Sequence, residues 1–121
     1  MRVKDKIGQY GEQVAVRYLQ REGFVILARN WRCEVGEIDI VALDGATVVV
    51  CEVKTRSGFG FGSGLEAVTR EKIARLRRLA LRWLAEAGRA GSPMRIDVVA
   101  VHRRRTQPRT EPLIEHVRGA Q

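Results

Sequence analysis

Charged and apolar side chains alternate along residues 36–56, whose sequence is GEIDIVALDGATVVVCEVKTR. Successive side chains of a β-strand point to opposite faces of a sheet, so Glu37 and Asp39 fall on one face of a first predicted strand. Glu52 and Lys54 fall on one face of the next strand by the same rule. If the two strands form a hairpin, three carboxylates and one lysine share a face, and such a set of groups is suited to bind a divalent cation.

The turn between the two strands decides which residues face each other. Asp44-Gly45 is a strong hairpin signal, and we take these two residues as the turn. This turn predicts that Glu37 lies directly opposite Glu52. The alternate positions form the apolar face, which consists of Ile38, Ile40, Cys51 and Val53.

Clustered carboxylates need a physical explanation, because like charges across a strand pair repel each other. In a partly buried site they cost several kcal/mol unless they are protonated or meet a cation. Lys54 neutralises only one of them, and Mg²⁺ would neutralise the others, since it binds one or two carboxylates together with water and phosphate oxygens. The other interpretation is a solvent-exposed strand face with an internal Glu–Lys pair, and the hairpin alone leaves both open.

The rest of the chain predicts the elements that position these charges. Apolar residues at helical spacing indicate a helix over residues 7–22, which Gly23 ends. Thr69 is placed to cap a second helix that runs to Ala87. Strands are expected over residues 24–32, 36–43, 46–54, 94–101 and 113–117. The resulting order αβββαββ predicts an α/β fold, with a central mixed sheet flanked by helices, in a single domain over residues 1–121.

The chain is strongly basic, with a formal net charge of +8 over 121 residues. A small domain of this charge favours polyanions, because binding releases their condensed counterions. We therefore expect a nucleic-acid partner, either DNA or RNA, although a basic composition also serves solubility alone. The cations expected to contact phosphates are Arg56, Lys72, Arg75, Arg103, Arg104 and Arg105. For Lys72, a plain surface charge is an equal alternative.

Other classes of site have little support in the sequence. The two cysteines lie far from the two histidines, unlike the ligands of a structural zinc site. The glycine-rich segment 57–64 lacks the spacing of a dinucleotide or P-loop motif, so no nucleotide cofactor is expected. Phe59 and Phe61 belong either to a plain connection or to a wedge against nucleic acid. Without a membrane-length apolar run or the apolar region of a signal peptide, we expect a cytoplasmic protein without membrane contact.

Asp39, followed on the next strand by residues 52–54 (EVK), resembles the motif of the PD-(D/E)xK nuclease superfamily, which has a restriction-endonuclease-like fold. The proline of that motif is absent, since residue 38 is isoleucine. Within the superfamily, the chain resembles the YraN family of small bacterial proteins grouped with endonucleases, over most of residues 8–101. A wider similarity to archaeal Holliday-junction resolvases includes a glutamate on the first helix, which Glu12 matches. The YraN resemblance is carried by the segments GQYGEQVAVRYLQREGF, NWRCEVGEIDIVALDG, VVVCEVKTR, EAVTREKIARLRRLA and RIDVVAV.

The resemblance implies a nuclease that depends on a divalent metal, Mg²⁺ or Mn²⁺. Asp39 and Glu52 would hold the metal, with the backbone carbonyl of Val53 as a third ligand. Glu12 would be a further ligand or a supporting group. Lys54 would orient the attacking water or stabilise charge on the phosphate. Branched or otherwise structured DNA is the substrate that the resolvase similarity favours, and a homodimer would let one-site domains cut two strands.

Several residues keep a second interpretation. Glu12 belongs either to the site or to the exposed surface of its helix. Glu37 lies beside the site without an assigned role, and pairing with an arginine such as Arg56 is its alternative. Asp97, a carboxylate within an apolar strand, is expected to make a structural hydrogen bond or to pair with an arginine. For the whole protein, the alternative to a nuclease is a nucleic-acid-binding module that keeps the nuclease fold without catalysis.

Overall fold

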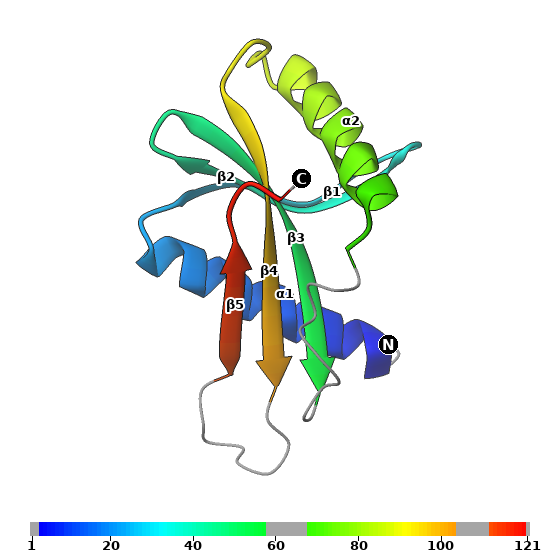
Figure 1. Ribbon diagram of the computed structural model, residues 1–121, viewed down its shortest axis with the longest axis vertical. Helices are drawn as coiled ribbons and strands as arrows, with labels where there is room; N and C mark the ends of the chain where they lie inside the picture. The colour runs from blue at the N-terminus through cyan, green and yellow to red at the C-terminus, as the bar shows by residue number, and fades with distance from the viewer. Residues whose placement is uncertain (1–2, 58–67, 104–111, 121) are drawn as a thin grey trace.

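The computed structural model describes residues 3–57, 68–103 and 112–120. Within them, two helices and five strands follow the predicted order αβββαββ (Figure 1). Their bounds are α1 Val3–Arg21, β1 Val25–Cys33, β2 Gly36–Asp44, β3 Thr47–Ser57, α2 Arg70–Glu86, β4 Met94–Arg103 and β5 Leu113–Val117. Neither described helix is long and apolar enough to cross a membrane. Phe59, Phe61, Arg104 and Arg105 lie outside the described residues, so the expectations for them stay predictions.

The five strands form one sheet in the order β1-β2-β3-β4-β5. Neighbouring strands are antiparallel except β3 and β4, which run parallel. A parallel pair needs a long crossover connection, and α2 lies in the connection between these two strands. The sheet is therefore mixed, as the sequence predicts.

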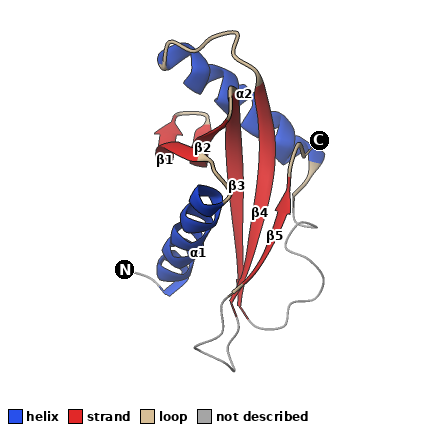
Figure 2. Ribbon diagram, turned by 90° about the vertical axis from the view of Figure 1, so that its left-hand side faces the viewer, coloured by secondary structure: helices blue, strands red, loops and turns tan. Residues whose placement is uncertain are grey.

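A helix packs against each face of the sheet (Figure 2). Val41 and Val50 face α2 and pack with its Leu79 in one core. Ile40 and Cys51 belong to the second core, on the side of α1. Because alternate residues of β2 and β3 serve two buried faces, these strands read as nearly continuous apolar runs.

The second helix begins where the sequence predicts. Thr69 Oγ1 accepts a hydrogen bond from the backbone N–H of Lys72 at 3.1 Å, which satisfies one of the free N–H groups of the first turn. A buried stripe that includes Ile73, Leu76 and Trp83 holds the helix on the sheet. The cap and the stripe together place Lys72 beside β3.

The first helix comes very close to the sheet at Gly11. A side chain at this position would overlap Thr55 of β3, because an added Cβ would lie 2.9 Å from the Thr55 Cβ. Ala15 and Leu19, one and two turns further along, are completely buried on the same side. The close approach holds Glu12, the next residue, at the surface of the sheet.

The hairpin turn lies one residue further along than predicted. Asp44 pairs with Thr47, so Gly45 is the first residue of a two-residue turn. Gly45 has a φ of +60°, which glycine adopts without strain at this turn position. The partner of each β2 residue therefore lies two positions further along β3 than predicted. This shift by itself leaves each side chain on its predicted face of the sheet but changes the residue directly opposite it.

Beyond this ladder, β2 leaves β3. The last residue pair between the two strands is Ile40 with Cys51, whereas β2 stays paired with β1 as far as Gly36. The predicted pairing of Glu37 with Glu52 is therefore wrong, because the two strands have separated before these residues are reached.

The separation also breaks the alternation of faces along β2. Ile40 packs in the core against α1, but Ile38 packs in the core against α2. The prediction that these two isoleucines share a face is therefore wrong. Asp39 lies between them, at the point where the two strands diverge.

Candidate functional site

Asp39 joins the two diverging strands through its side chain. Its Oδ2 accepts a hydrogen bond from the backbone N–H of Val53 at 2.8 Å. This bond takes the place of the ladder, which ends at the preceding pair. The carboxylate is thereby fixed in the gap between β2 and β3.

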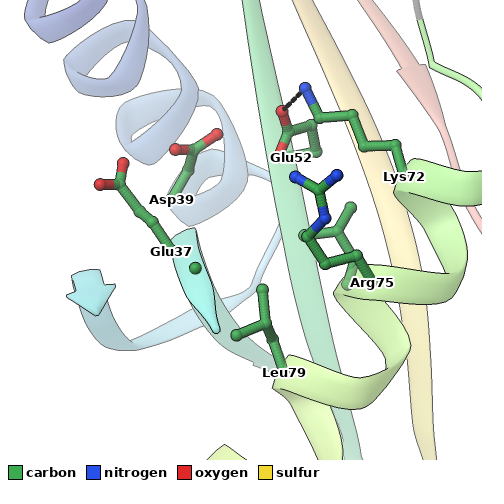
Figure 3. A pocket seen from close by; sticks show the side chains of 8 residues that line it. Glu37, Asp39, Glu52, Lys72, Arg75 and Leu79 are labelled. Atoms are coloured by element: carbon green, nitrogen blue, oxygen red, sulfur yellow. Dashed lines mark ion pairs between the residues drawn. The ribbon is translucent and has the colours of Figure 1, made fainter. Parts of the chain in front are cut away.

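Three carboxylates gather at this gap. Glu12 of α1 and Glu37 and Asp39 of β2 each offer one oxygen, and these oxygens all lie within 4.8 Å of one another. Figure 3 shows Glu52 across the gap from Asp39. Since Glu37, Asp39 and Glu52 line one hollow, the structure brings together the three strand carboxylates that the sequence predicts to share a face.

The cluster strongly perturbs Asp39, whose pKa is raised to about 7. Burial is the main cause, and the charge of Glu52 adds to it. The backbone N–H of Val53 opposes the shift, whereas Glu12 and Glu37 contribute further increases. A carboxyl group with this pKa is partly protonated at neutral pH unless a cation balances its charge.

Asn30 of β1 supports Glu12. Burial raises the pKa of Glu12, and this effect outweighs a hydrogen bond from the Asn30 side chain, which lowers it. Asn30 has a φ of +52°, a left-handed conformation that asparagine tolerates better than most residues. Asn30 is not among the site residues predicted from the sequence, and an asparagine within a predicted strand is the signal that could have identified it.

Two lysines contact Glu52, where the sequence predicts one. Lys72 Nζ lies 2.8 Å and Lys54 Nζ 3.2 Å from the same Oε1 of Glu52, whose side chain is only 10% exposed. Burial lowers the pKa of Lys54, and the adjacent Lys72 lowers it further. Lys72 is therefore more than a plain surface charge, and its contact with phosphate stays a prediction.

Glu37 also has an arginine partner, though not the suggested one. Arg32 Nε of β1 lies 2.7 Å from Glu37 Oε2. Arg56 instead lines a hollow beside Glu12. Because the Arg32 side chain is 75% exposed, its ion pair is weak, and Glu37 stays available to the carboxylate cluster.

Two hollows flank these side chains. The hollow in Figure 3, of about 210 Å³, is lined by Gly36, Glu37, Asp39, Glu52, Lys72, Arg75, Leu76 and Leu79. The second, of about 460 Å³, is lined by Ile7, Gly8, Glu12, Val53, Lys54, Thr55 and Arg56. Predicted metal ligands and predicted phosphate contacts therefore meet around one gap in the sheet.

Arg103 lies apart from this group. Its Cζ is 5.6 Å from the centre of the Tyr10 ring, at the end of β4. Arg103 lines neither of the two hollows at the carboxylates. In the sheet, however, Arg103 pairs with Ser57, so it lies one position along the ladder from Arg56, outside the two hollows.

Asp97 has the structural role expected of it. It is completely buried, and its Oδ1 accepts hydrogen bonds from Arg95 Nε at 2.9 Å and from the backbone N–H of Gly119 at 3.0 Å. Its Oδ2 lies 2.8 Å from His116 Nε2. Burial alone would raise the pKa of Asp97, but the bonds to His116 and Arg95 outweigh it and lower the pKa.

The sequence is similar to a group of known proteins. A family model described as "Uncharacterised protein family UPF0102" matches residues 11–101. A UPF0102 protein of Frankia alni is 56% identical over 121 residues, which cover 99% of this chain and 98% of the relative. A UPF0102 protein of Beutenbergia cavernae is 57% identical over 119 residues, which cover 98% of this chain and 98% of the relative. A UPF0102 protein of Nocardia farcinica is 48% identical over 120 residues, which cover 98% of this chain and 92% of the relative.

Proposed function

We propose that this chain, which belongs to the UPF0102 family, is a metal-dependent nuclease that hydrolyses phosphodiester bonds in DNA. The observation that carries the proposal is the meeting of carboxylates and lysines where β2 and β3 diverge. The residues that meet there are Glu12, Glu37, Asp39, Glu52, Lys54 and Lys72.

The donor atoms at the gap fit a hard divalent cation such as Mg²⁺ or Mn²⁺. Glu12, Glu37 and Asp39 present oxygens close enough to share one ion, and carboxylate oxygen is the ligand that these metals prefer. These three residues would hold the metal, and the motif resemblance adds Glu52 and the carbonyl of Val53. When bound, the ion supplies a Lewis acid that polarises a phosphodiester oxygen and activates water.

The lysines supply fixed positive charge on the other side of the gap. Both ammonium groups contact one oxygen of Glu52, which therefore holds them on its side of the gap. Figure 3 shows Lys72 there, across the gap from Asp39. Negative charge builds on the phosphate oxygens during hydrolysis, and positioned cations stabilise it. Lys72 would contact the phosphate, and Lys54 would orient the attacking water, the role that the motif resemblance gives it.

Membership of the PD-(D/E)xK superfamily is part of the same proposal. A mixed sheet carries Asp39 on one strand and the sequence Glu-Val-Lys on its neighbour, with a helix against each face. This arrangement is consistent with a restriction-endonuclease-like fold. The family match agrees with the YraN-like assignment made from the sequence.

We take DNA as the substrate because the superfamily resemblance points to it and because a net charge of +8 suits a polyanion. Arg75 lines the hollow beside Glu52, and Arg56 lines the hollow beside Glu12. Both arginines would contact phosphates, which positions a nucleic acid without reading its sequence.

Cleavage assays on a panel of substrates test the proposal. The full chain is incubated in Mg²⁺ or Mn²⁺ with linear, nicked, flap and four-way-junction DNA, and with RNA of the same sequence. We expect metal-dependent cleavage of DNA, fastest on a branched substrate, and a loss of about hundredfold or more in Glu52→Gln. Glu86→Gln, the same change at an exposed position of α2, should cleave like the wild type.

Three results would contradict the proposal in different ways. Undiminished cleavage by Glu52→Gln would refute the site. Tight, metal-independent binding without cleavage of any substrate would identify a binding module. Cleavage of RNA alone would identify a ribonuclease.

A further inference from the structure

A separate groove of about 280 Å³ lies between α1 and the start of β5. Its lining residues are Tyr10, Val14, Arg17, Arg21, Pro112 and Ile114. Figure 1 shows α1 crossing behind β3, β4 and β5. Tyr10 and Val14 each lie two positions from Glu12, about 200° around the helix. The groove is therefore on the other side of α1 from the carboxylates.

The lining of the groove combines apolar, aromatic and cationic groups. Val14 and Ile114 extend the core that lies on the side of α1. The ring of Tyr10 borders them, and this residue is 37% exposed. Arg17 and Arg21 are exposed one and two helical turns further along.

The positive charge of this groove is not neutralised by the described part of the chain. No carboxylate lines the groove, and among the described residues neither Arg17 nor Arg21 forms an ion pair. Arg103 adds a third cation, since its guanidinium lies over the Tyr10 ring. Arg95, in contrast, is paired with carboxylates. An anionic ligand is the occupant whose charge complements the groove.

We propose that this groove binds a single-stranded segment of the nucleic acid, with phosphates on Arg17 and Arg21 and a base against Tyr10. The inference rests on the proposed function, because the strand in the groove belongs to the substrate that is cleaved at the carboxylates.

The apolar and aromatic part of the lining favours a single strand over a duplex. Paired bases are stacked inside a duplex, which presents mainly phosphates and sugars outside its grooves. Unpaired bases expose their ring faces and stack on aromatic side chains or guanidinium planes. Tyr10 and Arg103 offer both kinds of surface at one end of the groove.

The position of the groove restricts which substrates occupy both sites. An α-helix with its side chains is about 10–12 Å across, so a strand that leaves the carboxylates must pass α1 to reach the groove. A flexible single strand makes such a path at low cost, whereas a stiff duplex does not. The preferred substrate therefore carries a single-stranded arm next to the bond that is cleaved.

Binding of a labelled oligothymidylate, about 16 nucleotides long, to the full chain in EDTA tests the inference. We expect Arg17→Gln/Arg21→Gln to weaken binding at least about tenfold and to reduce the slope of log K against log salt by about 1.4. Arg77→Gln/Arg78→Gln removes the same charge from exposed positions of α2 and should weaken binding less than about threefold. Equal weakening by the two double variants would overturn the inference.

The ring of Tyr10 provides a second test that does not involve charge. Tyr10→Ala should weaken oligothymidylate binding about tenfold, and Tyr10→Phe should bind like the wild type because it keeps the ring. Unchanged affinity in Tyr10→Ala would overturn the inference. An equal effect of Tyr10→Ala on poly-glutamate binding would do the same, because it would identify a general anion surface.

Separate assays test the groove and the nuclease site. In EDTA the oligothymidylate reports the groove, whereas metal-dependent cleavage of a blunt duplex reports the carboxylates. If the protein cleaves the duplex but neither double variant changes oligothymidylate binding, the proposal for the groove alone is overturned. Binding that depends on Arg17 and Arg21, in a protein that cleaves nothing, would support the groove and overturn the proposed function.

Discussion

Folding favours the neutral form of the Asp39 carboxyl group over the charged form. The pKa of Asp39 is about 7, against an ordinary value of 3.8. Burial is the main cause, and the charge of Glu52 is the next. A carboxyl group with a raised pKa in the folded state contributes stability below its ordinary pKa. That contribution is lost as the pH rises through the folded-state pKa.

Asp39→Asn should therefore change how stability depends on pH in the absence of divalent metal. The asparagine oxygen still accepts the Val53 N–H but carries no charge, so the variant escapes a destabilisation of up to about 4 kcal/mol above neutral pH. Urea unfolding at about pH 5 and about pH 8 measures the effect, and the variant should gain stability relative to the wild type at the higher pH. A stability difference that is independent of pH would contradict the raised pKa.

The residues of the site differ in how well the sequence predicts them. Asp39, Glu52 and Lys54 follow from strand alternation and from motif spacing, both of which are local. Arg32 lies directly opposite Glu37 in the ladder of β1 and β2, so its ion pair follows only once the register of that hairpin is known. Asn30 of β1 reaches Glu12 of α1 by a contact between elements far apart in the chain, which leaves no periodic pattern in the sequence.

At the scale of elements, the hairpin shows a limit of turn signals. Gly45 fits a two-residue turn either as its second residue, after Asp44, or as its first, before Ala46. Both choices keep the apolar alternation, so the sequence does not distinguish them. The structure takes the second choice.

The close contact of α1 with β3 makes Gly11 sensitive to substitution. Gly11→Ala should lower the free energy of unfolding by about 1–3 kcal/mol, because the new methyl group overlaps Thr55. Gly8→Ala on the same helix meets no atom within 4 Å and should stabilise the protein by up to about 1 kcal/mol through helix propensity. Urea unfolding compares the two variants.

Thr55→Ala provides a partial rescue of this contact, because it removes Oγ1, the atom nearest to the added Cβ, but keeps the Thr55 Cβ at 2.9 Å. If the overlap is the cause, Gly11→Ala/Thr55→Ala should be more stable than the sum of the two single changes predicts. Equal stability of Gly11→Ala and Gly8→Ala would contradict the close approach of helix and strand.

At the scale of the whole molecule, a buried network ties distant segments together. Asp97 of β4 binds Arg95, which also contacts Asp44 at the hairpin turn. His116 of β5 links Asp97 to the hydroxyl of Tyr18 on α1, which lies 2.8 Å from its Nδ1. The order of elements was predictable because each helix or strand has its own local pattern, but this network joins residues far apart in the chain.

Asp97→Asn should destabilise the protein by about 3 kcal/mol, because it removes the buried charge that pairs with His116 and leaves Arg95 with Asp44 alone. The lowered pKa of Asp97 means that its contribution is present above the ordinary carboxyl pKa and is lost as the pH falls through the folded-state value. The loss should therefore be larger at neutral pH than in acid, as measured by urea unfolding. Well below its melting temperature, the variant should cleave like the wild type, and a loss of cleavage in the folded variant would contradict a purely structural role.

The molecule carries a net charge of +8 around a group of carboxylates. Under the proposed function, this charge would attract DNA at long range, but the carboxylates would repel phosphate at the site itself. A bound divalent metal would remove this repulsion. The most direct measurement is the rate of nicking of supercoiled plasmid DNA as Mg²⁺ is titrated, for the wild type and Asp39→Asn. We expect a nicking rate that saturates with Mg²⁺, is absent in EDTA and falls about hundredfold or more in the variant. Nicking that needs no metal, or that persists unchanged in Asp39→Asn, would contradict it.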